Sequence, residues 1–325
     1  MKAPHFWSRP GATLGKILSP FGWVYCFVGK LSKSSVKTAR VNATVICVGN
    51  LVAGGSGKTP VALAFAAILQ RDDLAFLTRG YGGRLAGPTR VARATHTYVQ
   101  VGDEALLLTR AAPTWVARDR AAGARAAIDA GARLIVMDDG FQNPSLAKDI
   151  SIVVIDGVTG FGNGQLIPAG PLREPVAAGL ARADAVVIAG KDQTGITEKL
   201  PASLPVFTGR AVPTADKETW AGRKVVAFAG IGRPEKFYDT LATLGCDIVA
   251  THSFADHHPY RDAEIARIRA QAADLDAVAV TTEKDAVRLP QGIRDTIETL
   301  PVEFVWDDPV ALDRFLRERV GASAA

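Results

Sequence analysis

One stretch of the sequence has the glycines and the Lys-Thr ending that are typical of a phosphate-binding loop. It runs from Gly49 to Pro60 and follows an apolar, β-branched segment at 44–49 (TVICVG). Such glycines let backbone N–H groups turn inward around phosphate oxygens, and the start of the following helix favours the same anion. The predicted phosphate-binding residues are Ala53, Gly54, Gly55, Ser56, Gly57, Lys58, Thr59 and Pro60.

Two side chains at the end of this loop could act on a bound nucleotide. We expect the ammonium group of Lys58 on the β- and γ-phosphates and the hydroxyl of Thr59 on Mg²⁺. Val52 stands where the strict GxxxxGK[ST] pattern has a glycine, so the loop is a variant of that pattern. A glycine-rich turn before an ordinary helix is the alternative.

A pair of carboxylates follows another apolar segment, at 134–139 (LIVMDD). An acidic residue at the end of a buried strand is where a carboxylate that organises Mg²⁺ lies in nucleotide-binding folds. Asp138 or Asp139 is therefore expected beside Thr59 if the two strands are neighbours. An exposed acidic turn after a core strand is the alternative.

Seven segments, in fixed order, resemble the tetraacyldisaccharide 4′-kinases, the lipid A 4′-kinases of Gram-negative bacteria. The similarity extends from the N-terminal apolar segment to beyond residue 285, and TRGYGG, DDGFQ and GGSGKTP in this order are its most specific part. The segments are NLVAGGSGKTP (50–60), TRGYGG (78–83), GDE (102–104), DDGFQ (138–142), LREP (172–175), FADH (254–257) and TEKD (282–285).

The resemblance implies an enzyme that uses ATP and Mg²⁺ to phosphorylate a lipid. The acceptor would be the 4′-hydroxyl of a tetraacylated, 1-phosphorylated glucosamine disaccharide, and the product would be lipid IVA. The lipid would lie in the cytoplasmic leaflet of the bacterial inner membrane, and the enzyme on the cytoplasmic face of that membrane.

A sugar hydroxyl is a very weak acid, so a base within hydrogen-bond reach would assist its attack on phosphorus. The resemblance points to Asp103 paired with His257 for this role. A helix N-cap is the alternative for Asp103, which follows an apparent strand at 98–102. His258 is a neighbour that the sequence does not separate from His257. The pair would form across a cleft between two domains, so that domain closure would gate catalysis.

The resemblance supplies the remaining site residues. Arg79 is expected on a phosphate and Tyr81 against the sugar; the alternative is a glycine-rich turn with a solvated arginine. Arg173 would steady the transferring phosphate, with an ordinary salt bridge as the alternative. The predicted metal ligands are Thr59, Asp138, Asp139 and Glu174, and the predicted substrate contacts are Arg79, Tyr81, Glu104, Gln142 and Arg173.

The TEKD segment follows an expected strand at 277–281. Its spacing does not fit the [NT]KxD motif with which GTPases read a base. A place near the nucleotide base, a place at the domain hinge and a solvated loop remain open for it.

The elements that must position these residues alternate between apolar strands and helical patterns, which is the signature of an α/β fold. The strands are nearly continuous apolar runs, as in parallel sheets buried on both faces. Strands are expected at 44–49, 74–78, 114–118, 133–138, 150–155 and 184–189, and helices at 58–70, 103–111, 119–131 and 174–182.

A second set of elements begins near residue 222, with strands at 224–229, 247–251, 277–281 and 302–306 and helices at 234–244, 261–273 and 309–319. The polar, proline-containing stretch 190–221 is expected to connect the two sets. We therefore predict a P-loop kinase domain over 41–210, with a mostly parallel sheet flanked by helices, and a smaller α/β domain over 221–325.

The first 40 residues differ from the rest in charge. The chain of 325 residues carries a formal net charge of +5, yet residues 1–40 hold seven basic and no acidic side chains. The remainder is slightly acidic, which argues against a broad nucleic-acid-binding face. Three cysteines without CxxC spacing exclude a disulfide scaffold and a cysteine-based metal site.

The same 40 residues carry apolar side chains at helical spacing: Leu14, Ile17, Leu18, Phe21, Val24, Tyr25, Val28 and Leu31. Pro20, Gly22 and Lys16 break the apolar stretch that a full membrane span needs, so a helix lying on or dipping into the membrane is favoured. Trp7, Trp23 and Tyr25 suit a headgroup boundary, and Lys16, Lys30, Lys33 and Lys37 suit anionic lipid. A helix packed on the protein's own core is the alternative.

Two other functions compete with the lipid kinase. A membrane-bound nucleotide switch would explain the phosphate loop and the amphipathic segment but has no use for an Asp–His pair across a cleft. A soluble small-molecule kinase leaves the apolar N-terminus unexplained. The sequence offers no sign of an obligate protein partner.

Overall fold

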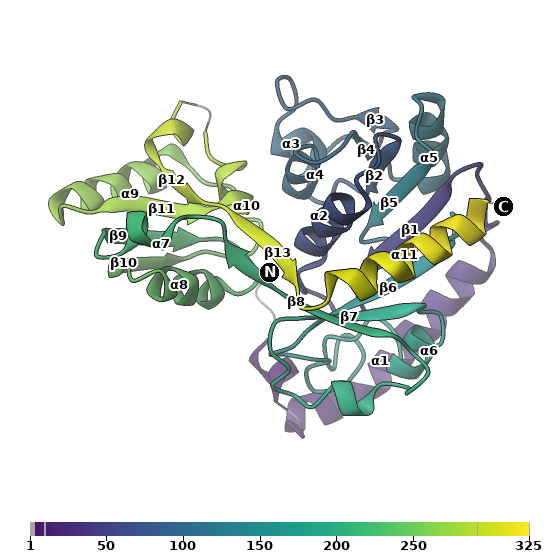
Figure 1. The fold of residues 1–325 in the computed structure, drawn as a ribbon. Coiled ribbons are helices and arrows are strands. Elements are labelled where there is room, and N and C mark those ends of the chain that lie inside the picture. Colours follow the sequence, from purple (N-terminus) through teal and green to yellow (C-terminus); the bar gives the residue numbers. More distant parts are fainter. Residues whose placement is uncertain (1–3, 10, 291, 325) are drawn as a thin grey trace.

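Two β-sheets form the framework of the computed structural model, which describes residues 4–9, 11–290 and 292–324 (Figure 1). In the described residues the larger sheet has nine strands in the order β13-β8-β7-β6-β1-β5-β2-β4-β3. It is parallel except for the edge strands β3 and β13. Its strands are β1 (Thr44–Gly49), β2 (Leu74–Thr78), β3 (Thr89–Arg90), β4 (Thr114–Val116), β5 (Leu134–Asp138), β6 (Ile150–Asp156), β7 (Ala185–Ala189), β8 (Val206–Pro213) and β13 (Val302–Trp306).

Helices cover both faces of the larger sheet, as a doubly wound α/β fold requires. The central strands are buried along their whole length because both of their faces pack against helices. One face packs against α2 (Lys58–Leu69) and α11 (Pro309–Ala324), and the other against α5 (Arg120–Asp129) and α6 (Val176–Leu180). The predicted mostly parallel sheet flanked by helices is confirmed.

The strand expected at 98–102 is wrong: this segment forms the short helix α3 (Tyr98–Val101). Thr97 and Gln100 make a capping box that satisfies the first N–H groups of the turn. Gly102, with φ of +85°, then ends α3 and leads into α4 (Asp103–Leu108). Four residues are too few for their periodicity to distinguish one helical turn from a short strand.

A smaller, wholly parallel sheet has the order β10-β9-β11-β12. It is made by β9 (Lys224–Ala229), β10 (Asp247–Ser253), β11 (Val278–Thr282) and β12 (Glu298–Leu300), with α7 (Lys217–Trp220), α8 (Pro234–Thr243), α9 (Asp262–Asp274) and α10 (Glu283–Ala286) around it. Short 3₁₀ turns lie at η1 (His5–Ser8), η2 (Thr197–Lys199) and η3 (Arg294–Thr296).

The end of the chain does not stay with the smaller sheet. Strand β13 pairs antiparallel with β8, which itself lies inside the stretch expected to be a plain connection, and Figure 1 shows the two strands side by side. Trp306 stacks on Phe65 of α2 at a centroid distance of 5.3 Å, and Leu312 and Leu316 of α11 are fully buried in the same cluster. The predicted smaller domain over 221–325 includes 302–306 and 309–319, because local periodicity does not reveal which of two sheets a strand joins. We call the smaller sheet and the helices around it the smaller unit.

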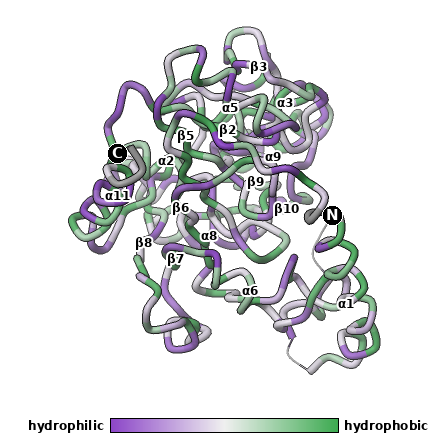
Figure 2. The backbone as a smooth tube through the Cα atoms, turned by 90° about the vertical axis from the view of Figure 1, so that its right-hand side faces the viewer, coloured by the Kyte–Doolittle hydropathy of each residue, from purple (hydrophilic) through white to green (hydrophobic). Residues whose placement is uncertain are grey.

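Helix α1 (Thr13–Ser34) lies at the periphery of the molecule, with hydrophobic stretches along it (Figure 2). It is one continuous helix that includes Pro20. Gly15, Gly22 and Cys26 face the protein body; a Cβ at Gly22 would lie 3.0 Å from Leu166. The large side chains point away: Leu14, Ile17, Phe21, Trp23, Val24, Tyr25, Phe27, Val28 and Leu31 are all exposed.

In the part of the chain that the structure describes, no helix has the length and apolarity needed to cross a bilayer. Trp7 bonds through its indole N–H to the carbonyl of Pro168, 3.0 Å away. Of the predicted lipid-facing lysines, the side chain of Lys33 lies outside the described residues.

Candidate active site

The glycine-rich loop joins the carboxyl end of β1 to α2, at the edge of the sheet where ligands gather in open α/β folds. Gly57 takes φ of +84° immediately before the first turn of α2, a conformation that favours glycine. The amide of Asn50 donates to Ser56 Oγ over 2.9 Å, and Ala53 N–H bonds to the carbonyl of Pro171. These contacts hold the loop in a fixed shape while Gly54 and Gly55 remain exposed.

The next two side chains of the loop lie beside the acidic pair. Thr59 Oγ1 donates to Asp138 Oδ2 over 2.9 Å, because β1 and β5 are neighbours, as expected. Lys58 Nζ lies 3.7 Å from Asp139 Oδ1. Burial raises the pKa of Asp138 to about 7, with help from the charge of Glu104, whereas Lys58 and Arg173 outweigh burial at Asp139 and lower its pKa.

A second loop packs on the phosphate loop and brings Arg173 and Glu174 to it. Arg173 donates to Asp139 Oδ1 over 3.1 Å and to the amide oxygen of Gln142 over 3.3 Å. Gln142 donates to the Asn50 carbonyl over 2.7 Å and to Glu174 over 3.1 Å. Glu174 pairs with Arg182. Lys58, Asp139, Gln142, Arg173 and Glu174 thus form one connected network.

Asp103 and His257 meet across the two sheets. His257 Nδ1 lies 2.8 Å from Asp103 Oδ2, and we call this pair the dyad. His258 instead bonds to Glu264 over 3.0 Å and stacks on Phe254, so it is not the partner of Asp103.

The contacts of Asp103 are not those of a helix N-cap, the alternative considered for it. The N-cap of α4 is Gly102, and the one backbone N–H of α4 that the Asp103 side chain accepts is that of the next residue, Glu104, over 2.9 Å. Its side chain is 2% exposed, compared with 24% for His257. Burial raises the pKa of Asp103, but the hydrogen bond from His257 and nearby cations outweigh this and hold the pKa below its ordinary value.

The TRGYGG loop lies against the start of α4. A Cβ at Gly102 would clash with the carbonyl of Tyr81, so glycine permits this close approach. The Tyr81 ring is 5.3 Å from that of His257 and 63% exposed, and Arg79 is also exposed. Tyr81 is therefore at the open side of the dyad, where it can contact a ligand, and Arg79 is exposed two residues earlier in the same loop.

Sequence reasoning left several residues of the site without a role. Arg288 Nε lies 3.3 Å from Asp103 Oδ2, and Lys284 Nζ lies 3.3 Å from His257 Nε2. Asp156, at the end of β6, pairs with Arg233 over 3.3 Å and with Lys236. The available signals were the TEKD segment and the acidic end of a buried strand, but neither showed what it would meet.

A second contact joins the smaller unit directly to the phosphate loop. A Cβ at Gly232 would lie 3.4 Å from the backbone nitrogen of Gly55. This close approach and the Asp156 ion pairs hold the smaller unit at the edge of the larger sheet that carries the phosphate loop. The dyad and the phosphate loop therefore lie at the same edge.

A magnesium ion fits the chemistry of the acidic pair. Asp138 Oδ1 is buried without a hydrogen-bond partner, although its other oxygen accepts from Thr59. Among the described residues there is no group of three or more His, Cys, Asp or Glu side chains that would cage a metal. Mg²⁺ commonly keeps several waters and needs only one or two carboxylates besides phosphate oxygens.

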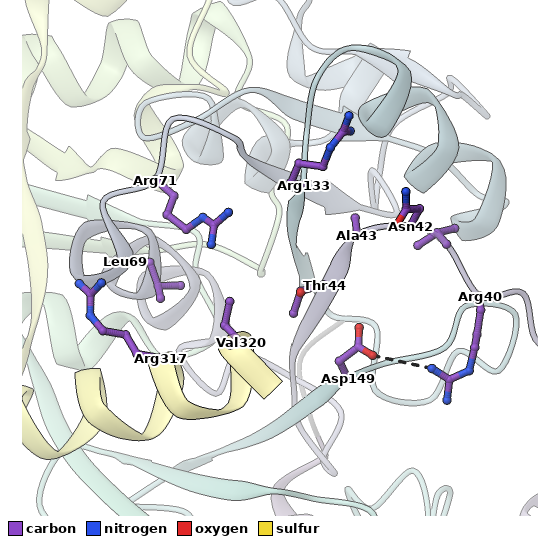
Figure 3. Close-up of a pocket in the computed structure, with 12 residues that line it drawn as sticks. Arg40, Asn42, Ala43, Thr44, Leu69, Arg71, Arg133, Asp149, Arg317 and Val320 are labelled. Atoms are coloured by element: carbon purple, nitrogen blue, oxygen red, sulfur yellow. Dashed lines mark ion pairs between the residues drawn. The ribbon is translucent and has the colours of Figure 1, made fainter. Parts of the chain in front are cut away.

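A separate cavity of about 580 Å³ lies at the opposite edge of the larger sheet, where β1 begins (Figure 3). Four arginines line it, but Arg71 forms bidentate bonds with Asp73, and Arg317 Nε donates to both carboxylate oxygens of Asp313. None of the predicted site residues lines this cavity.

Comparison with known proteins identifies the family. Residues 14–321 match the family model described as Tetraacyldisaccharide-1-P 4′-kinase. Tetraacyldisaccharide 4′-kinases of Rhodospirillum centenum and Rhodospirillum rubrum are 53% and 50% identical, with 97% of this chain covered in both cases and 96% and 97% of the relatives. A crystal structure of LpxK from Aquifex aeolicus in complex with ATP superposes with a TM-score of 0.77 at 25% identity, covering 95% of this chain and all of that one.

The sequence matches and the structural match thus point to the same family for the chain that carries the variant phosphate loop, the acidic pair and the dyad. The chain belongs to the tetraacyldisaccharide 4′-kinase family, the ATP-dependent lipid A 4′-kinases.

Proposed function

We propose that this kinase transfers the γ-phosphoryl group of ATP to the 4′-hydroxyl of tetraacyldisaccharide 1-phosphate, giving lipid IVA, with the dyad of Asp103 and His257 acting on the acceptor. The observation that carries the proposal is the 2.8 Å contact between these two residues across the sheets, on the same side as the phosphate loop. A protein that only binds or hydrolyses a nucleotide has no need of such a pair.

On the donor side, the glycine-rich loop and Lys58 hold the phosphates of ATP. Thr59 and Asp138 are the proposed ligands of Mg²⁺, with Asp139 and Glu174 close by; the ion would neutralise charge on the phosphates. The orphaned oxygen of Asp138 supports this assignment. Arg173, held by Asp139 and Gln142, offers a fixed cation for the charge of the transferring group.

On the acceptor side, Asp103 takes the proton of the 4′-hydroxyl. Its lowered pKa keeps it ionised, and each carboxylate oxygen has lone pairs beyond the single hydrogen bond that it accepts here. His257 orients the carboxylate. Tyr81 packs on the sugar, while Arg79 and Glu104 contact polar groups of the disaccharide.

Helix α1 attaches the enzyme to the cytoplasmic face of the inner membrane as a peripheral or monotopic anchor. Its small residues face the protein and its large apolar residues face outward, which supports an interfacial helix. Lys16 and Lys30 are exposed on the same helix and suit anionic headgroups. We propose no nucleic-acid ligand and no obligate protein partner.

A transfer assay tests this function. Purified protein, Mg²⁺ and γ-labelled ATP are incubated with tetraacyldisaccharide 1-phosphate in detergent micelles, and lipid is separated from free phosphate. Label on the lipid supports the proposal. Label released only as phosphate, at a rate indifferent to the lipid, would contradict it and favour a nucleotide switch.

A further inference from the structure

The TEKD segment is not a solvated loop but a half-buried part of the interface between the two sheets, with Asp285 fully buried. Thr282 caps α10 by accepting the N–H of Asp285. Asp285 is fully buried and accepts from Gly230 N–H over 2.8 Å and from Tyr260 over 2.6 Å. Arg288, 1% exposed, bonds to Asp285 over 2.7 Å. These bonds fix α10 against the loop that carries His257.

Lys284 projects from this fixed helix to the far side of the His257 ring. Its Nζ lies 3.3 Å from His257 Nε2 and 3.3 Å from Asp256 Oδ1, and 3.7 Å from Glu104 Oε1. Burial lowers the pKa of Lys284, but the surrounding carboxylates, Glu104 first among them, raise it by more. The net effect is a pKa above the ordinary value, so the side chain stays a cation.

An ammonium group has donors and no acceptor. When it bonds to His257 Nε2, that nitrogen must be the acceptor, and the single proton of the neutral ring must lie on Nδ1. That proton is the one donated to Asp103 Oδ2. A proton cannot be added at Nε2 while the ammonium donates to it.

We propose that Lys284 is a positioning residue of the dyad, which fixes the proton of His257 on the nitrogen that faces Asp103 and keeps the Asp103 carboxylate ionised in acid. This inference rests on the proposed function. It extends that function to the TEKD segment, which touches neither the phosphate loop nor the acidic pair in the contacts described above.

Several charged or titratable groups face the dyad, and all bear on its proton balance. They come from the TRGYGG loop (Tyr81), from α4 (Glu104), from the loop before α9 (Asp256 and His258) and from α10 and the turn after it (Lys284, Asp285 and Arg288). His258 pairs with Glu264, and Asp285 pairs with Arg288. Lys284 is therefore the cation at Nε2.

The test compares Lys284→Met, Lys284→Gln and Lys284→Arg by pH profiles of kcat and KM. Loss of the cation raises the pKa of Asp103, so the acid limb of the kcat profile of Lys284→Met should move up by about one pH unit, with KM changed less than about twofold. Lys284→Arg should keep the limb near its wild-type place. Lys284→Gln keeps an N–H donor without charge, and it should shift the limb while retaining the ring tautomer.

Lys236→Met is the matched control, because it removes another cross-sheet lysine that contacts Asp156 and not the dyad. It can lower kcat at every pH, but its acid limb should not move. If the acid limb of Lys236→Met moved as far as that of Lys284→Met, the proposal would be contradicted. The shift would then come from weakened contact between the two units and not from the charge beside the dyad. Melting temperatures establish that each variant is folded.

Nitrogen-15 NMR of His257 in the free protein reads the tautomer without any activity. The wild type should show a protonated Nδ1 and an unprotonated Nε2 at neutral pH, and Lys284→Met should show Nε2 carrying a proton in part of the population. An unchanged tautomer together with an unchanged acid limb would overturn the inference. If the wild type transfers no phosphate to the lipid, the proposed function fails by itself, and the NMR comparison still decides the role of Lys284.

Discussion

Nδ1 of His257 lies 2.8 Å from Oδ2 of Asp103, although the two residues are 154 positions apart and belong to elements around different sheets. The Asp103 carboxylate is almost completely buried by this contact and by Arg288. The dyad, which we propose accepts the proton of the 4′-hydroxyl, is thus assembled only when the smaller unit lies against the larger one. On this proposal, closure of the two units would be part of building the acceptor site.

The two adjacent histidines should differ sharply in their importance. His257→Gln removes the ring that orients Asp103, and we expect kcat for transfer to fall about 10²-fold. His258→Gln changes only a contact with Glu264, so kcat should stay within about twofold. Initial rates of label transfer from ATP to the lipid check both variants. Equal losses in the two would show that the loop as a whole, and not the dyad, is needed.

Asp138 should lower the stability of the free enzyme at neutral pH. Its pKa is raised to about 7 mainly by burial, so the folded state binds this proton more tightly than the unfolded state does. The free energy of unfolding attributable to this group therefore falls as pH rises from about 4 to 7, and it stays reduced above that range.

Asp138→Asn removes this penalty. At pH 8, without nucleotide or metal, the free energy of unfolding of the variant should be about 1–3 kcal/mol larger than that of the wild type. At pH 4 the two proteins should be nearly equal, while transfer activity should be lost in the variant. Urea unfolding at the two pH values makes the comparison. A variant that is less stable at pH 8 would show that the carboxylate is satisfied in the folded protein.

The exposed apolar face of α1 should carry membrane binding. Phe21 and Phe27 are 61% and 63% exposed, and burying each ring in an interface contributes up to about 2–3 kcal/mol. The double variant Phe21→Ser/Phe27→Ser should bind vesicles with phosphatidylglycerol roughly 10²-fold more weakly in sedimentation assays.

Val310→Ser is the control for this experiment, because Val310 is an exposed apolar residue of α11, remote from α1 in sequence. Its vesicle affinity should not change. Unaltered binding by the α1 variant would mean that another surface meets the membrane.

The ion pairs at Asp156 should hold the two units together. Asp156 is 3% exposed and meets both Arg233 and Lys236 of the smaller unit. Asp156→Asn leaves these partly exposed cations without their buried carboxylate, and we expect kcat/KM to fall about tenfold or more. Asp307→Asn, which breaks an exposed pair with Arg210, should change it little. Steady-state kinetics would refute this role if the two variants behaved alike.

Much of the larger sheet and of the donor site could be predicted from local patterns. The segment 44–49 is apolar without alternation, as a strand buried on both faces must be, and the glycines after it place Lys58 and Thr59 at the start of a helix. Because β1 and β5 are neighbours, Asp138 falls beside Thr59 as expected.

What escaped prediction depended on contacts distant in sequence. The alternating strand at 302–306 fits either sheet, and only the packing of Trp306 on Phe65 shows that it belongs to the larger one. The place of Lys284 and the role of Arg288 could not be predicted, because the sequence does not say that His257 and Asp103 will converge on them. The exposed apolar face of α1 was foreseen, but not the row of small residues on which it rests.

Replacement of Asp103 by asparagine tests the central claim most directly, because the shape of the side chain is kept and only its ability to take a proton is lost. With γ-labelled ATP and tetraacyldisaccharide 1-phosphate, we predict that Asp103→Asn transfers label about 10³-fold more slowly than the wild type, while its affinity for a fluorescent ATP analogue is unchanged. Transfer at more than about a third of the wild-type rate would contradict the account, since Asp103 would then be no more than a structural part of α4.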